Sequence, residues 1–364
     1  MARLPRSDQV GSLRRPDFLM QAREQLRAGT CSREQLRDRE DEAIRDALQR
    51  QRDTGIEIVT DGEFRRDAWQ TGISDALDGF DSTYPKRESR LTDGTIITLE
   101  MHTKAIRRRL RQTRRITAHE VEFLKANTDA PFKVTMPSPN AVIWGSYQEG
   151  VTDQAYPTRE DLRQDLIPIY QAEVAGLVSE GVQYIQLDEG FTRYGVPHWR
   201  ENIRSAGLDP DGSLATDIAT ENAIYDSVDR DRVIFGSHLC RGSRTTARGA
   251  GDYDGVAEQV FADLHVDRFL LEDDVGQLEP ELLRFLPQSK TVVLGLVTTK
   301  SPDLEDPAEL RRGIEQAARH CSLDQLAVSP QCGFGGSADN DFMPYEQQFA
   351  KLELLASVAR KVWA

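Results

Sequence analysis

The segment Val233-Ile234-Phe235-Gly236-Ser237-His238-Leu239-Cys240 guides the interpretation of the whole chain. Its first four residues are mostly apolar, as in a short buried strand. His238 and Cys240 stand two positions apart at its end, and alternation along a strand places such residues on the same side. An imidazole and a thiol so placed can bind one metal ion, although an isolated His-x-Cys pair is more often an ordinary strand end.

Two further ligand-type residues follow other strand-like runs. Glu272 comes directly after the run 268–271, and Cys332 comes shortly after the run 326–329. Together with His238 and Cys240 they form a ligand set that suits a zinc ion, Zn2+. A structural zinc site is the alternative, but such sites use closely spaced Cys-x-x-Cys pairs and stabilise small folds. The dispersed set on a large chain therefore predicts a catalytic zinc.

Composition narrows the class of protein. A hydrophobic fraction of 38% with 29% charged residues is typical of a soluble globular chain, and the net charge of -14 argues against nucleic-acid or membrane-surface partners. No apolar run approaches the length of a membrane span, and the first residues lack an apolar signal core. The 4 cysteines are too few and too scattered for a disulfide framework. We therefore expect a cytoplasmic protein.

Strand-like and helical segments alternate along the chain. The expected strands are 8–12, 56–59, 132–136, 182–187, 233–238, 269–271, 291–297 and 326–329. The expected helical segments are 17–54 with a break at 29–30, then 159–180, 214–228, 254–264, 279–286, 305–319 and 344–362. Eight βα units in 364 residues predict an α/β fold, a (β/α)8 TIM barrel, as one catalytic domain over residues 1–364.

An inserted β segment is expected near residues 92–118. Arginines are concentrated within the range 107–115. They could hold an anionic substrate tail, but in an acidic protein a solvated, salt-bridged face is the favoured interpretation.

Polar residues collect at the expected strand ends, where the active sites of such barrels form. They are Ser12, Asp61 and Glu63, Asp188 and Glu189, His238 and Cys240, Glu272, Lys300, and Cys332. Barrel loops are generally polar, which explains one carboxylate on its own. That rule does not explain why two of only 4 cysteines and one of 6 histidines fall at these ends.

At these residues the chain resembles a known family, the cobalamin-independent methionine synthases. It is similar to their catalytic barrel and, more closely, to short single-barrel homologues. The matching blocks occur in the same order and are 10–16, 60–66, 186–189, 237–240, 294–297, 300–302 and 329–334, with the match running to the final helix. So many ordered blocks are more specific than any single motif.

The resemblance implies roles for individual residues. It implies that His238, Cys240, Glu272 and Cys332 bind zinc. It also implies that Ser12, Glu63 and Asp188 hold the amino-acid end of a thiol such as homocysteine, and we add the neighbouring Glu189 to these substrate-binding candidates. Two carboxylates suit an ammonium group. A salt bridge with Arg65 or Arg66 is the alternative for Glu63.

Departures from the family pattern concern the methyl donor. Trp144 lies near the position of the family's pterin-stacking tryptophan, and burial in a helix would account for it equally well. Lys300 stands where the full-length enzymes have a histidine, with Thr298 in place of an acidic residue, and Gly190 replaces a proline. Asp188 and Lys300 are the catalytic candidates. Lysine is a weaker acid than histidine, so we expect Lys300 to hold an anionic or polar donor as a fixed cation. The short homologues lack the amino-terminal half on which a long polyglutamate tail could lie, so we also expect little preference for polyglutamylated folates.

The sequence thus predicts a zinc-dependent methyltransferase that acts on a zinc-activated thiol, with homocysteine converted to methionine. The donor is a methyltetrahydrofolate or another methyl donor. Alkyl transfer to another thiol, as in epoxyalkane:coenzyme M transferases, and C–S bond cleavage are alternatives, and a non-catalytic zinc-binding barrel is a third. The expected partners are the small-molecule thiol and the methyl donor. Assembly into a homo-oligomer is left open.

Overall fold

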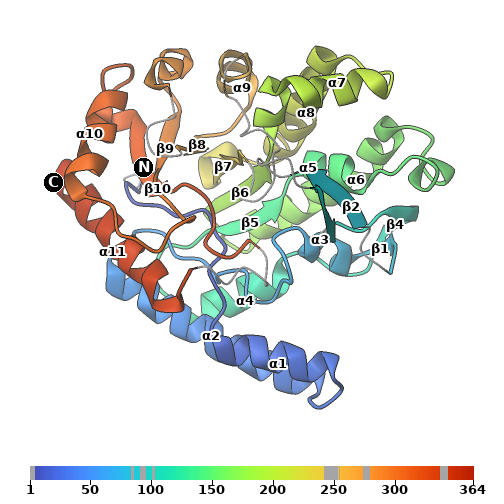
Figure 1. The fold of residues 1–364 in the computed structure, drawn as a ribbon, viewed down its shortest axis with the longest axis horizontal. Coiled ribbons are helices and arrows are strands. Elements are labelled where there is room, and N and C mark those ends of the chain that lie inside the picture. The colour runs from blue at the N-terminus through green and yellow to red at the C-terminus, as the bar shows by residue number, and fades with distance from the viewer. Residues whose placement is uncertain are drawn as a thin grey trace.

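Six parallel strands form the centre of the molecule. The computed structural model describes residues 5–82, 86–90, 96–100, 103–241, 253, 255–273, 279–336 and 343–364. The strands are β5 (Val134–Pro137), β6 (Tyr184–Glu189), β7 (Ile234–Leu239), β8 (Arg268–Glu272), β9 (Thr291–Val297) and β10 (Leu326–Pro330). Each strand pairs with the next one along the chain, so the strands from β5 to β10 lie side by side in sequence order (Figure 1).

Two more segments complete the barrel. Ser7 forms a parallel bridge with Val328 of β10, and Val59 forms one with Phe132, just before β5. The two outer segments also meet each other, because Leu13 N donates to Gly62 O at 3.0 Å. The predicted (β/α)8 barrel is confirmed. Its first two strands are shorter than expected and are reduced to bridges. Side chains also join these two segments to each other, since Gln9 Nε2 donates to Ile58 O at 3.1 Å and Thr60 Oγ1 donates to Gly11 O at 2.7 Å.

Helices surround the strands on the outside, as Figure 1 shows. They are α1 (Asp17–Arg27), α2 (Arg33–Thr54), α3 (Thr71–Ala76), α4 (Ala118–Asn127), α5 (Pro139–Ser146), α6 (Arg159–Ser179), α7 (Pro197–Ser205), α8 (Pro210–Tyr225), α9 (Ala257–Asp263), α10 (Pro307–Ala317) and α11 (Tyr345–Val362). Capping boxes at Ser32 and Thr158 begin α2 and α6, and Gly55, with φ +76°, ends α2. The expected helix at 279–286 is a 3-10 helix, η4 (Pro280–Phe285). Within the described ranges, every helix is too short or too polar to span a bilayer.

The inserted β segment is confirmed, with different bounds. Strand β1 (Leu77–Phe80) pairs antiparallel with β4 (Ile106–Gln112), and β2 (Lys86–Arg90) pairs antiparallel with β3 (Ile96–Glu100). The segment therefore begins before residue 92 and ends before 118, where α4 starts. The arginines of β4 are exposed, and Arg107, Arg109 and Arg111 pair with Asp81, Asp165 and Asp78. This is the salt-bridged face that the acidic composition favoured.

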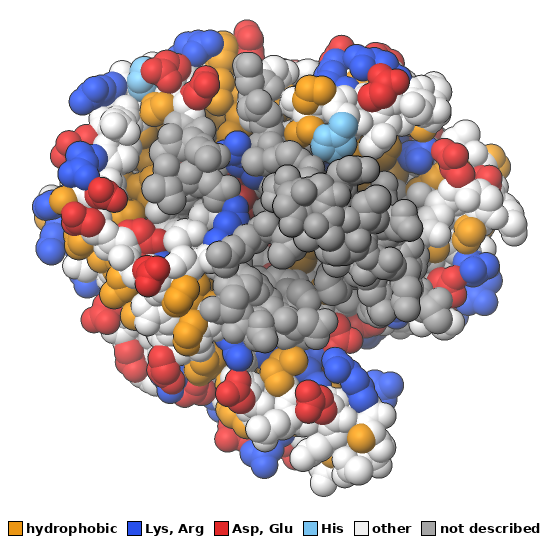
Figure 2. Space-filling view, in the orientation of Figure 1, with side chains coloured by type: hydrophobic (Ala, Val, Ile, Leu, Met, Phe, Trp, Pro, Cys, Tyr) orange, Lys and Arg blue, Asp and Glu red, His pale blue; other side chains and the backbone are white. Residues whose placement is uncertain are grey.

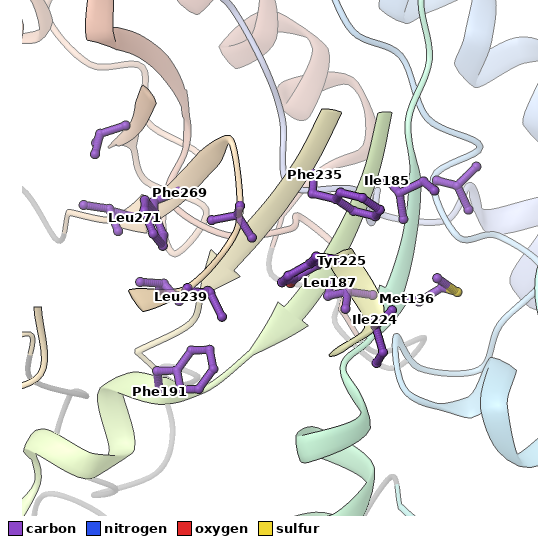
Figure 3. Packing of buried hydrophobic residues seen from close by; sticks show 14 of the residues in the cluster. Met136, Ile185, Leu187, Phe191, Ile224, Tyr225, Phe235, Leu239, Phe269 and Leu271 are labelled. Carbon is purple, nitrogen blue, oxygen red and sulfur yellow. The ribbon is translucent and has the colours of Figure 1, made fainter. Parts of the chain in front are cut away.

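Alternation along the strands separates an apolar shell from the barrel lumen. Ile185, Leu187, Phe235 and Phe269 belong to the large buried cluster beneath the helices, and several of these side chains are seen in Figure 3. Residues of the opposite parity point into the lumen. There a small separate cluster contains Val10, Leu270, Val293 and Ala327. His238, Glu272 and Asp188 share this inward parity, so the strand pattern brings them together at one end of the lumen.

Candidate active site

The four expected metal ligands meet at the carboxyl ends of β7, β8 and β10. His238 is the last residue but one of β7, Cys240 follows that strand, Glu272 ends β8, and Cys332 follows β10. Their ligand atoms all lie within 4.8 Å of one another. His238 Nε2 is 3.7 Å from Glu272 Oε1. One ion could therefore contact an imidazole, a carboxylate and two thiols, which is a donor set that suits zinc.

The electrostatics of this set fit a cation. Both ring nitrogens of His238 and both carboxyl oxygens of Glu272 are buried without a hydrogen bond to the described part of the chain. Burial lowers the pKa of His238 to about 3, so the imidazole is neutral and can act as a ligand. Burial, followed by the nearby Cys240, raises the pKa of Glu272 well above its usual value. Unpaired buried polar atoms are costly, and a divalent ion would satisfy them.

Tyr253 fixes the two strands that carry ligands, and the sequence reasoning missed it. Its buried hydroxyl lies 3.2 Å from Leu239 O and 3.3 Å from Glu272 O, and it accepts a hydrogen bond from Glu272 N at 2.8 Å. One side chain thus joins the end of β7 to the end of β8. A tyrosine in the loop after β7 gave no periodic signal that could have identified this role.

Asp188 lies beside the ligand set because β6 pairs with β7. Its Cα is registered with that of His238. Gln186 Nε2 donates to Asp188 Oδ1 at 2.7 Å. Burial, followed by the negative charge of Glu63, raises the pKa of Asp188 to about 8. Two carboxyl groups held close together in a buried site favour the binding of a cation such as an ammonium group.

Glu63 has one oxygen engaged and one unsatisfied. Thr135 Oγ1 donates to Glu63 Oε1 at 2.7 Å, whereas Glu63 Oε2 is buried without a hydrogen bond to the described residues. The alternative salt bridge to Arg66 exists, with Arg66 Nη1 3.5 Å from Glu63 Oε1. The guanidinium is mainly bound to Glu120, at 2.7 and 2.9 Å. The salt bridge therefore does not use up the carboxylate, and Oε2 remains available for a ligand.

The other predicted residues occupy different environments. Ser12 is buried against the loop that follows Cys332, because its carbonyl accepts from Phe334 N at 2.8 Å. Lys300, after β9, lies near Glu272, where its positive charge opposes the rise in the pKa of that carboxyl. The backbone of Glu189 belongs to β6, and its side chain lies outside the described residues.

Trp144 lies on α5 and is packed among protein groups. Its Nε1 donates to Asp217 Oδ2 at 2.7 Å, and its ring meets Trp199 edge-on at 5.7 Å between centroids. The Arg159 guanidinium lies 5.2 Å from the Trp144 centroid. The Trp144 side chain is half-buried and is held by these contacts, and its role in donor binding stays a prediction.

Comparisons with known proteins agree with this arrangement. The family model described as the catalytic domain of cobalamin-independent synthase matches residues 7–360. The chain belongs to this family. Its relatives include the uncharacterized protein YxjH of Bacillus subtilis, which is 35% identical over 98% of this chain and 94% of its own length. The methionine synthase of Saccharolobus solfataricus is 24% identical over 89% of this chain and 86% of its own length.

Solved structures of the family share the fold. A B12-independent methionine synthase from Shewanella sp. W3-18-1, in complex with selenomethionine, superposes with a TM-score of 0.76 at 21% identity, covering 99% of this chain and 98% of its own. A putative vitamin-B12 independent methionine synthase from Listeria monocytogenes gives a TM-score of 0.73 at 27% identity, with the same coverage. The chain is thus a methionine synthase-like catalytic domain of a methyltransferase family.

Proposed function

We propose that the protein is a zinc-dependent methyltransferase that methylates the sulfur of a thiol amino acid, with homocysteine as substrate and methionine as product. The observation that carries the proposal is the convergence of His238, Cys240, Glu272 and Cys332 within 4.8 Å, beside the inward-facing Asp188. A zinc ion held by these residues would keep an incoming thiol deprotonated at neutral pH, where a free thiol with a pKa of ~8.5 is mostly protonated.

The protein's own residues would bind the amino-acid end of the substrate. Asp188 and the unsatisfied Oε2 of Glu63 offer two acceptors for the substrate ammonium group. Ser12, beside the loop after Cys332, offers a hydroxyl for the substrate carboxylate. Two carboxylates would be poor partners for a thiol that carries a sulfonate, so the geometry favours an amino acid over coenzyme M.

The reaction would form one bond and break another. The substrate sulfur attacks the methyl carbon, and the bond from that carbon to the donor breaks, with its electron pair going to the donor. A tertiary amine donor such as a methyltetrahydrofolate would also require a proton at the departing nitrogen. Lys300, whose charge acts on the Glu272 carboxyl, would attract the polar donor as a fixed cation.

Removal of either thiol ligand tests the metal site. We expect Cys240→Ser and Cys332→Ser to lower zinc from one ion per chain to well below stoichiometric, since both sulfurs belong to the ligand set. The fold should persist, because the shell beneath the helices packs independently of the metal. Metal analysis measures the zinc content, and circular dichroism measures whether the fold is retained. Cys321→Ser changes a cysteine outside the ligand set and serves as the matched control.

A methyl-transfer assay tests the reaction. We expect the zinc-loaded protein to convert homocysteine to methionine with at least one folate or non-folate methyl donor. Full zinc occupancy in both serine variants would contradict the ligand assignment. Bound zinc without methyl transfer from any donor tried would instead favour the non-catalytic alternative.

A further inference from the structure

A fully buried lysine, Lys133, lies behind Asp188, the carboxylate proposed to bind the substrate ammonium group. Lys133 lies just before β5, and its Nζ donates to Asp8 Oδ1 at 2.8 Å and to Gln186 Oε1 at 2.6 Å. The Lys133 and Asp8 side chains are both 0% exposed. Buried ion pairs of this kind seldom stabilise a fold more than apolar packing would. A buried lysine in the lumen therefore calls for an explanation other than stability.

Gln186 connects this lysine to the active site. Its Oε1 accepts from Lys133 Nζ, and its Nε2 donates to Val10 O at 2.6 Å and to Asp188 Oδ1 at 2.7 Å. A rotated amide would place an oxygen against two acceptors and an NH2 group against an ammonium. All three contacts thus select one orientation of the amide, which always presents a donor to Asp188.

The other end of this chain of contacts is anchored in the lumen. Tyr184 OH donates to Asp8 Oδ2 at 2.8 Å, and Arg268 Nη2 lies 3.7 Å from the same oxygen. Asp8 thereby holds Lys133 in place, Lys133 holds Gln186, and Gln186 holds Asp188. The connected groups extend from the interior of the barrel to its carboxyl-terminal rim, and each of them is buried.

We infer that Lys133 and Gln186 are positioning residues of the thiol amino-acid site, which fix the Asp188 carboxylate in the orientation that receives the substrate ammonium. The inference rests on the proposed function. Neither residue touches the substrate, and both act through Asp188. Preorganisation of this kind removes the cost of ordering the carboxylate when the substrate binds.

A double-mutant cycle tests whether the two residues act through Asp188. Gln186→Met keeps the length of the side chain and removes the donor. In the zinc-loaded protein we expect it to weaken homocysteine binding about tenfold, as for the loss of one hydrogen bond to a charged group, with zinc content unchanged. In the Asp188→Asn background the same change should alter the Kd less than twofold. Isothermal titration with L-homocysteine measures all four values.

Two further variants test whether the effect on binding comes from the loss of zinc or fold, or from the removal of any buried amide. Lys133→Met should weaken homocysteine binding as Gln186→Met does. If Gln186→Met loses zinc or its folded circular dichroism signal, the cycle is run with Lys133→Met in its place and judged by the same Kd values. Gln348→Leu removes a buried amide that bonds the backbone of Arg14 and should leave the Kd unchanged.

The outcomes separate the inference from the proposed function. Unchanged binding in both Gln186→Met and Lys133→Met, or an effect that adds fully to that of Asp188→Asn, would overturn the positioning role alone. If Asp188→Asn itself bound homocysteine as tightly as the wild type, the proposed amino-acid site would fall, and the inference with it.

Discussion

Glu63 shows at the scale of one residue how the site is built. Its φ of 58° is the only positive value at a non-glycine position among the described residues. Such a backbone is uncommon for a glutamate and typically persists where the surrounding structure enforces it. Asp61 Oδ1 accepts from Glu63 N at 2.9 Å, and Thr135 holds the side chain. The local strain thus turns a carboxylate from the loop after the second barrel segment toward the lumen.

The first prediction concerns Asp188. We expect Asp188→Asn to weaken homocysteine binding roughly tenfold to a hundredfold and to leave zinc binding intact, because the side chain lies beside the ligand set and is not part of it. Calorimetry and metal analysis of the same sample separate the two effects.

A control for this prediction is Asp211→Asn, which changes an exposed carboxylate paired with Arg200. It should leave both measurements unchanged. Equal loss of zinc and of homocysteine binding in Asp188→Asn would mean that Asp188 supports the metal site instead of the amine.

The strand ends show how far the sequence could predict the site at the scale of elements. The inward positions of β6, β7 and β8 are readable from alternation, so the sequence alone could place Asp188, His238 and Glu272 on one rim. Thr135 and Gln186 also occupy inward positions of their strands. Both are polar residues within buried strands, and this signal could have identified them as part of the site. The contacts of Tyr253 and the bounds of the inserted β segment depend on tertiary packing, which strand periodicity does not encode.

A second prediction follows from the joining of β7 to β8. We expect Tyr253→Phe to lower zinc affinity by about 10- to 100-fold, the usual range for residues that orient metal ligands, because Glu272 loses the hydroxyl that holds its backbone. Competition with a chelator of known affinity measures the change. Tyr147→Phe removes a hydroxyl bonded to Tyr156 O and is the matched control. Equal affinities in both variants would show that packing alone fixes β8.

At the scale of the whole molecule, the barrel separates stability from chemistry. The apolar shell lies between strands and helices, whereas the lumen holds the polar groups that reach the rim. Acidic and basic side chains are interspersed around the edge of the face shown in Figure 2. The excess is acidic, with a net charge of -14. A field of this sign slows the approach of polyanions and is screened by salt.

The last prediction uses this charge to address the methyl donor. Lys300, whose positive charge acts on the Glu272 carboxyl, can attract one polar or anionic group of a donor. The overall negative charge opposes a long polyglutamate tail. We therefore expect kcat/KM for triglutamyl and monoglutamyl methyltetrahydrofolate to agree within a few-fold, with the triglutamyl value improving as salt rises. Matched kinetics at low and high salt measure this, and Lys300→Met should reduce kcat/KM for both folates alike. A triglutamyl preference of about a hundredfold would instead require a basic surface for the tail, and the proposed role of Lys300 as the main cation for the donor would then be wrong.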